Sequence, residues 1–421
     1  MTSKWQFLAW RVTRQTWFRS TVYCLLGVVT ALASLAFGPM VPETYAEGLG
    51  AGSVDTILTI LASSMLAVAT FSLTTMVSAY KAASNSTTPR AATLLIEDST
   101  SLNALATFIG AFLFSIVGIV LLSTKVYGGG GRAVLLVVTI AVIAIVAATL
   151  LRWIDRLSRL GRVDETIDQV EEVTQQALEE CARRPSMGGQ RLSGVPGNAA
   201  AVFTDRVAYV QHLDMGRLQE LAGEHDLRVY DPARPGTFMD PSRPLLHVAG
   251  ETDDETLDAL RQAFTLAGAR TYVQDPRFGL IALSEVASRA LSPGINDPGT
   301  AIDVVGTLVR LLVRYDRSCR ESEGEIRHDR VWVRPLDHRE MIVDGFRPVA
   351  RDGAGMVEVG IRLRKGLAVL AGCRDADLAA AARAMAAEAL ERAKGALSLE
   401  ADVAALEAIG LDAPDWRDVQ G

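Results

Sequence analysis

Four long apolar runs constrain the fold of this chain more than any other feature of its sequence. A helix needs about 20 mainly apolar residues to cross a hydrocarbon core about 30 Å thick. Runs that approach or exceed this length lie at Thr21–Phe37, Ile57–Ala79, Leu102–Leu122 and Ala133–Leu151. The sequence therefore predicts a mainly α, integral membrane protein with four transmembrane helices in contact with a lipid bilayer.

The first run is short and follows a basic segment, which is also the pattern of a secretory signal peptide. Ala31-Leu32-Ala33 would then provide the cleavage site. Three more apolar runs follow, however, and tryptophan is enriched where a helix enters a membrane. Tryptophans precede the first run at Trp5, Trp10 and Trp17, which favours an uncleaved anchor.

Basic residues orient the four predicted helices. Cytoplasmic loops of bacterial membrane proteins carry an excess of Lys and Arg. Basic residues precede the first run, loop 38–56 has none, and four follow the last run at Arg152, Arg156, Arg159 and Arg162. We therefore expect a multi-pass protein of the bacterial inner membrane with both termini in the cytoplasm.

Charge is unevenly distributed along the 421 residues. Residues 1–162 carry 12 basic and 6 acidic side chains, whereas residues 163–421 carry 30 basic and 43 acidic ones. Proteins that bind nucleic acid need a basic face. The acidic C-terminal part therefore argues against nucleic acid as a partner.

The patterns predict five segments. They are a basic cytoplasmic N-terminus (1–20), a four-helix transmembrane domain (21–151), a helical stalk and linker (152–198), a small mixed α/β module (199–250) and a helical cytoplasmic domain (251–421). The stalk is expected to continue the fourth span as a helix up to Pro185, weakened locally at Gly161. Such a helix could transmit movement between membrane and cytoplasm, or it could be a packed connector.

The hairpin-like stretch Arg234–Pro244 has a turn spacing similar to that of lipoyl-type modules. Those modules need a lysine at the turn to carry the prosthetic group, and residues 199–250 contain none. A cofactor arm is therefore excluded, and no cofactor is expected.

Small hydroxyl residues mark one face of the second run. They recur at helical spacing and fall within about 100° of one another around the helix axis. They are Thr56, Thr59, Ser63, Thr70, Thr74 and Ser78, and the same face continues to Lys81. Two interpretations are open: small residues allow helices to pack closely in lipid, or the hydroxyls line a wetted path with Lys81 at its cytoplasmic mouth. No Asp, Glu, Arg or His lies inside any of the four runs, so the usual mark of a proton relay is missing.

The most distinctive soluble stretch is DPRFGLIALSEVASRALSPGINDPGTAID, at 275–303. Asp275-Pro276 and Asp297-Pro298 each place a good N-cap before a proline suited to the first helical position. The sequence therefore predicts two helices joined by a polar turn that contains Ser292, Asn296 and Asp297. The turn could simply fix the angle between the helices, or the second helix start could receive a ligand or a partner's charge.

The motif ALSPGINDPGTA, the Thr88-Pro89-Arg90 tripeptide after the second span and the segment VAYVQHLD together resemble one bacterial family. It is a family of predicted membrane proteins that carries a domain of unknown function, and the resemblance runs from the first span to about residue 400. It implies a four-helix membrane region with a cytoplasmic domain, and it supplies no activity and no catalytic residues.

Signatures of common enzymes are missing from the sequence. The glycine run Gly128–Gly131 lacks the GK[ST] of a phosphate loop, and no GxSxG or HExxH motif occurs. The five histidines are dispersed without metal-ligand spacing, so neither a catalytic nor a metal site is expected. Two functions are weighed instead. The first is a channel-like or transport-like homo-oligomer for an ion or small solute, with a cytoplasmic assembly or gating domain. The alternative is a membrane-anchored regulatory or scaffolding protein without a conducting path.

Overall fold

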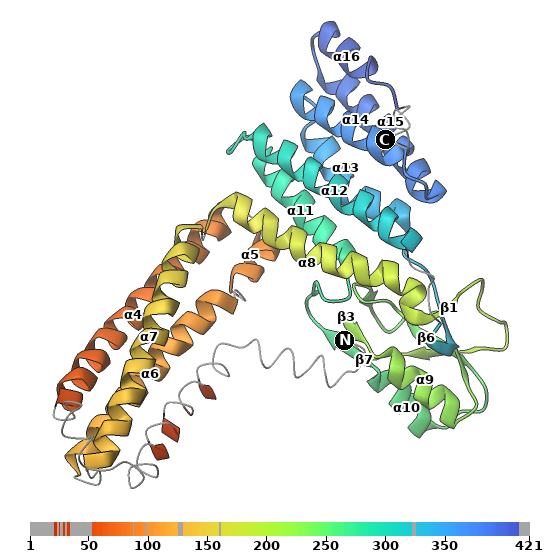
Figure 1. The fold of residues 1–421 in the computed structure, drawn as a ribbon. Helices are drawn as coiled ribbons and strands as arrows, with labels where there is room; N and C mark the ends of the chain where they lie inside the picture. The colour runs from red at the N-terminus through yellow and green to blue at the C-terminus, as the bar shows by residue number, and fades with distance from the viewer. Residues whose placement is uncertain are drawn as a thin grey trace. The chain divides into compact units, whose positions relative to one another are not determined.

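The computed structural model describes residues 53–86, 88–96, 99–124, 129–159, 161–321 and 326–411, with scattered positions between 21 and 33. The predicted N-terminus 1–20 and, apart from those positions, the predicted first span Thr21–Phe37 lie outside the described residues. The chain divides into two compact units (Figure 1). A membrane unit comprises Ala9–Ser86 and Ala92–Glu165, and a C-terminal unit comprises Thr87–Ala91 and Thr166–Gly421.

Three of the four predicted spans are confirmed as helices long and apolar enough to cross a membrane. They lie within α4 (Val54–Ser86), α6 (Ser99–Ser123) and α7 (Gly129–Arg159). The apolar stretches span Val54–Ala82, Thr100–Ser123 and Gly131–Leu157. Each exceeds the predicted run by a few residues at one or both ends, because a helix can continue beyond the apolar part of its sequence.

The three helices pack through large apolar side chains on their facing sides. One cluster is centred on Phe108 of α6, which is fully buried, and includes Leu61 and Met65 of α4. Trp153 of α7 contacts Phe108 edge-on, with ring centroids 6.3 Å apart. A second cluster, nearer the other end of the helices, joins Leu58, Phe114 and Leu135.

A break after α7 corrects the prediction of one helix that continues to Pro185. Helix α7 ends at Arg159 and α8 (Val163–Arg183) begins after Gly161. Gly161 has φ +85°, a left-handed conformation that glycine adopts without steric cost and that ends a right-handed helix. From Thr166 onward, α8 belongs to the C-terminal unit. Its apolar face is buried there at Ile167, Val170, Ala177, Leu178 and Ala182.

Two small sheets share one hydrophobic core in the C-terminal unit. The five-stranded sheet has the order β1-β8-β4-β6-β2, and the three-stranded sheet has the order β5-β3-β7. Strands β1 and β4 both pair with β8 in parallel, and the other neighbours are antiparallel. The strands are β1 (Gly189–Arg191), β2 (Ala200–Phe203), β3 (Ala208–Leu213), β4 (Arg228–Tyr230), β5 (Phe238–Met239), β6 (Pro244–Ala249), β7 (Phe264–Ala267) and β8 (His328–Val333).

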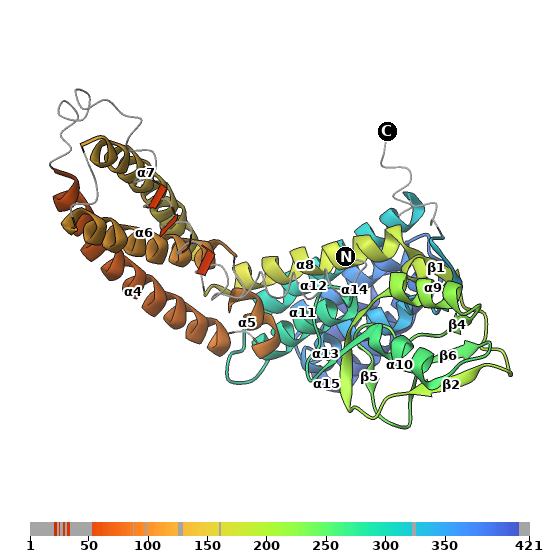
Figure 2. The ribbon, with the colours of Figure 1, turned by 90° about the horizontal axis from the view of Figure 1, so that it is seen from below.

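Helices α9 (Met215–Glu224) and α10 (Asp254–Gln262) lie beside these sheets (Figure 2). Their apolar faces join the strands in a core that contains Leu218, Leu221 and Leu260, each at most 2% exposed.

A stack of helices completes the C-terminal unit. It consists of α11 (Pro276–Ala290), α12 (Pro298–Glu321), α13 (His338–Asp352), α14 (Val357–Ala371), α15 (Ala376–Ala396) and α16 (Glu400–Glu407). Helix α8 runs along α11 and α12 (Figures 1 and 2). Gly279 of α11 lies directly against Thr174 of α8, and Arg310 of α12 pairs with Glu171 of α8.

The expected boundary of the α/β module at 199–250 does not match the sheets. Strands β2 to β6 lie inside the expected module, but β1 comes from the predicted linker and β7 and β8 come from the segment 251–421, which was expected to be helical. The prediction of a helical domain over 251–421 was therefore wrong at β7 and β8. Each of the three strands has only three to six residues, too few for a period of two to stand out against helical periodicity.

Candidate functional site

The hydroxyl face of α4 points away from the helices that α4 packs against. Thr59, Ser63, Thr70, Thr74, Ser78 and Lys81 are all exposed. The packed face lies on the opposite side of the helix, where Leu58, Leu61, Met65 and Ala69 are buried. The hydroxyl face therefore makes no part of the packing with α6 and α7 among the described residues.

Four hydroxyls of this face, those of Thr59, Ser63, Thr70 and Thr74, are satisfied within the helix itself. The hydroxyl of Thr59 donates to the carbonyl oxygen of Asp55 at 2.9 Å, and that of Thr70 donates to Leu66 at 2.9 Å. Ser63 and Thr74 make the equivalent bond to the carbonyl four residues back, each at 3.0 Å. A Ser or Thr that bonds its own helix can face lipid, a neighbouring helix or water without leaving a polar atom unpaired.

The turn between α11 and α12 holds the second set of predicted residues. Asp297 caps α12: its carboxylate accepts the backbone N–H of Thr300 at 3.1 Å and the Thr300 hydroxyl at 2.6 Å. These hydrogen bonds hold the pKa of Asp297 below its usual range. Ser292 donates its hydroxyl to the carbonyl of Arg289 at 2.6 Å, and Asn296 adopts φ +53°, which asparagine tolerates better than most residues. Ser292 and Asp297 thus form hydrogen bonds within the turn, and the backbone of the turn positions Asn296.

The segment after α4 belongs to the C-terminal unit. Arg90 forms an ion pair with Glu285 of α11, and the Tyr272 hydroxyl donates to the backbone carbonyl of Arg90 at 2.8 Å. The guanidinium groups of Arg90 and Arg270 both lie over the ring of Phe278, at 6.0 Å and 5.2 Å from its centre. Phe278 therefore connects the short segment between two predicted spans to the interior of the C-terminal unit.

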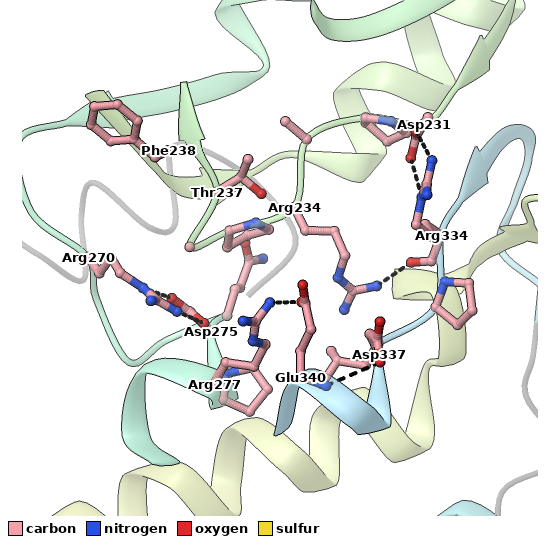
Figure 3. Close-up of a pocket in the computed structure, with 18 of the residues that line it drawn as sticks. Asp231, Arg234, Thr237, Phe238, Arg270, Asp275, Arg277, Arg334, Asp337 and Glu340 are labelled. Atoms are coloured by element: carbon pink, nitrogen blue, oxygen red, sulfur yellow. Dashed lines mark hydrogen bonds and ion pairs between the residues drawn. The ribbon is translucent and has the colours of Figure 1, made fainter. Parts of the chain in front are cut away.

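A cavity of about 550 Å³ opens beside Arg270 (Figure 3). Its wall comes from the loop between β4 and β5, the residues before β6, the start of α11 and the loop between β8 and α13. Five arginines and five prolines stand in this wall: Arg234, Arg243, Arg270, Arg277 and Arg334, with Pro232, Pro235, Pro244, Pro276 and Pro335. Four carboxylates line it as well: Asp231, Asp275, Asp337 and Glu340.

Ion pairs hold three of these arginines. Arg270 binds the buried Asp275 with two hydrogen bonds of 2.7 and 2.9 Å. Burial raises the pKa of the Asp275 carboxyl, and the two bonds from Arg270 oppose that shift. Arg334 binds Asp231 in the same two-point manner. Arg277 pairs with both Glu340 and Asp344; burial lowers its pKa, and these carboxylates more than restore it.

A second cavity, of about 770 Å³, shares Arg234, Arg334 and the stretch Pro335–Asp337 with the first. It is lined by Cys181 and Cys319, and burial raises the pKa of both thiols. A thiol with a raised pKa carries little thiolate at neutral pH, so neither is an activated nucleophile. Among the described residues no group of three or more His, Cys, Asp or Glu is placed to hold a metal ion.

Neither cavity was predicted from the sequence. The stretch Arg234–Pro244 was noticed only for its turn spacing, and Arg270, Arg277 and Arg334 were not singled out. A signal was present: Asp-Pro or Arg-Pro dipeptides recur at 231, 234, 243, 275 and 334. Each places a charged side chain on a backbone that the following proline restricts to extended or turn conformations.

Comparisons with known proteins place the whole chain in context. A model of the family described as predicted membrane protein (DUF2254) matches residues 13–369. Uncharacterized proteins of Mycobacterium bovis and of two strains of Mycobacterium tuberculosis are each 46% identical to the chain over 61 residues. This stretch covers 14% of the chain and 11% of each relative. No solved structure matches the chain.

Proposed function

Because the chain belongs to the family of predicted membrane proteins DUF2254, we propose that it is a channel-like or transport-like homo-oligomer of the bacterial inner membrane. In this proposal the C-terminal unit is cytoplasmic and gates a path that the hydroxyl face of α4 lines. The solute is an ion or a small polar molecule.

The observation that carries the proposal is the position of the hydroxyl face on α4. Its residues lie opposite the side that packs against α6 and are exposed among the described residues, which would let them meet a second copy or border a path between copies. Aligned small and hydroxyl residues suit both roles, because they allow close approach of helices and offer water a polar wall. Lys81, exposed at the end of the same face, would favour anions at that mouth.

Control by the C-terminal unit is supported by the contacts of Arg90. The segment Thr87–Ala91 directly follows α4 in the chain and is held by Glu285, Tyr272 and Phe278. A movement of α11 would therefore displace the segment that directly follows the end of α4, the helix that carries the hydroxyl face. The arginines at the end of α7 and just after it, Arg152, Arg156, Arg159 and Arg162, support a cytoplasmic location for this unit.

The membrane-anchored regulator remains a second candidate, because apolar side chains flank the hydroxyls. Ile60 is 62% exposed and Phe71 is 61% exposed on the outer side of α4. With its hydroxyls bonded internally, this surface would also be stable in lipid without any path.

Single cysteines distinguish the two candidates. In a background without the four native cysteines, substitutions at Thr59, Ser63, Thr70, Thr74 and Ser78 should react with small hydrophilic thiosulfonates if the face is wet, since the reactive thiolate forms only in water. Cysteines at Leu66 and Leu73 are the controls: both side chains are exposed, at 53% and 47%, but they lie outside the arc of the hydroxyl face, so they should resist. Leu61, buried against α6, should resist in both cases.

Flux completes the test. Thr70→Phe or Thr74→Phe should change solute flux in liposomes, Leu73→Phe should not, and Lys81→Glu should shift the ion preference. Inert cysteines along the face together with ion-tight liposomes would rule out the path and leave the anchored regulator.

A further inference from the structure

We propose that the cavity walled by the five arginines binds a small molecule that carries a phosphate group. This site lies wholly in the C-terminal unit, and it stands whether or not α4 lines a path.

Size and rigidity suit the cavity to a small ligand. Its volume of about 550 Å³ falls in the range of small-molecule sites, roughly 300–1,000 Å³. Five prolines in the wall restrict its backbone, because the pyrrolidine ring fixes φ. Gly236 turns with φ +90° directly above Asp275, where any side chain would collide with that carboxylate. The loop carrying Arg234 is therefore fixed close to the start of α11.

The charge of the wall runs against that of the surrounding chain. Residues 163–421 carry 43 acidic and 30 basic side chains, yet arginines outnumber carboxylates in the cavity wall. Carboxylates already offset most of this positive charge, and the remaining excess would attract an anion.

The ion pairs orient these guanidinium groups without using all their donors. Arg270 and Arg334 each bind their carboxylate through Nε and Nη2, and Arg277 binds Asp344 through Nε and Glu340 through Nη1. One Nη group of each is then uncommitted among the described residues. A guanidinium held on one edge by a carboxylate presents its other N–H groups in a fixed direction.

Arg234 gives the site its uncompensated charge. Its Nη1 donates to the backbone carbonyl of Arg334 at 2.9 Å, and within the described part of the chain no carboxylate pairs with it. Its side chain is half-buried and points into the cavity near Arg277 and Glu340 (Figure 3). A partly desolvated guanidinium without a counter-charge attracts an anion more strongly than an exposed, paired one does.

Phosphate fits this arrangement better than a carboxylate does. A phosphate monoester has three peripheral oxygens and a charge of about −1.5 to −2 at neutral pH, so it can accept bonds from guanidinium groups on several walls at once. A carboxylate has two coplanar oxygens and one charge. Phe238, 46% exposed at the rim, offers apolar surface to an organic part of the ligand.

The test is calorimetric titration of pyrophosphate and of ATP, without divalent metal, into the full-length protein in discs of phosphatidylcholine. We expect saturable binding that weakens as salt is added. Arg234→Ala should weaken it at least tenfold. Arg206→Ala, which removes an exposed arginine outside the cavity, should leave it unchanged.

Arg243→Ala is a second variant that keeps the test informative if Arg234→Ala does not fold. Arg243 is exposed, lines the cavity and has no ion pair among the described residues, so its loss should weaken binding several-fold with an unchanged unfolding temperature. A phosphate could also come from a lipid headgroup. Discs that contain phosphatidic acid would then compete with pyrophosphate in an Arg234-dependent manner, whereas a soluble ligand predicts no competition. Absence of Arg234-dependent binding to pyrophosphate, ATP and phosphatidic acid alike would overturn the proposal.

Discussion

Arg90 and Glu285 form an ion pair although they lie 195 residues apart in the chain. Arg90 closes the Thr88-Pro89-Arg90 tripeptide, and Glu285 lies on the helix that leads into the Ser292–Asp297 turn. Two of the segments on which the family resemblance rests are thus connected by this pair through α11. Within the C-terminal unit, this pair therefore fastens the segment that follows α4 in the chain to α11.

Charge reversal, first of each residue and then of both, tests the role of the Arg90–Glu285 ion pair. The two side chains are 50% and 32% exposed, so the pair should contribute no more than about 1 kcal/mol to overall stability. Its effect should instead be local: Arg90→Glu or Glu285→Arg should speed hydrogen exchange of the amides of Thr88, Arg90 and Ala91, and the double reversal should slow it again. Arg217→Glu, which breaks the surface pair with Glu220, is the control and should leave that segment unchanged. Equal exchange in all variants would show that the ion pair does not hold this segment.

The cap of α12 predicts an acid-sensitive stability. Asp297→Ala should lower the free energy of unfolding by about 0.5–2 kcal/mol, and Asn or Ser should restore most of it. The pKa of Asp297 is lowered in the folded protein, so its contribution is present above the unfolded pKa and is lost as pH falls through the folded pKa. The free energy of unfolding, measured with urea, should therefore change less between neutral and acid pH in Asp297→Asn than in the wild-type protein. A stable Asp297→Asn protein without function would instead assign the carboxylate a functional role.

Close packing of α8 on α11 predicts a steric effect at Gly279. A Cβ at this position would overlap the Thr174 side chain. Gly279→Ala should therefore lower stability by about 1–3 kcal/mol, the usual cost of overpacking a core. Thr174→Ala should recover part of that loss in the double variant, and Gly268→Ala, whose Cβ meets nothing within 4 Å, should be tolerated. Thermal unfolding of the purified protein measures all four.

Orientation in the membrane can be checked with an impermeant maleimide in intact cells. Cysteines introduced at Glu47 and Gly129 should react, because both lie outside the cell in the proposed topology. Native Cys181, in the C-terminal unit, should react only after the cells are opened. Labelling of Cys181 from outside would reverse the orientation and the cytoplasmic gating role with it.

Local signals were the predictable part of this fold. Three membrane helices follow from their apolar length, and both caps before proline at 275 and 297 lie where the sequence placed them, because each depends on neighbours within a few residues. The expected α/β module at 199–250 likewise contains strands β2 to β6 and helix α9.

Features that depend on distant partners could not be predicted. Arg234, Arg270 and Arg334 meet only after three separate segments fold together, and nothing in their spacing specifies that meeting. The outward direction of the α4 hydroxyls was also open, since amphipathicity shows that a helix has two faces but not which one a neighbour covers. The break at Gly161 illustrates a smaller limit: glycine marks weakness in a helix, and the surrounding structure decides whether the helix continues.

The position of β8 has a consequence for how the chain is made. Strand β8 lies between β1 and β4, yet it is synthesised last: Gln190, in β1, donates to the carbonyl of Asp329, 139 residues later. Until the ribosome has passed Val333, the early strands lack their central neighbour and expose unpaired edges. Long-range closure of this kind slows folding and leaves intermediates open to aggregation. A nascent chain released before β8 should accordingly be a substrate for chaperones and proteases, and the helices from α13 onward give the sheet time to close while synthesis continues.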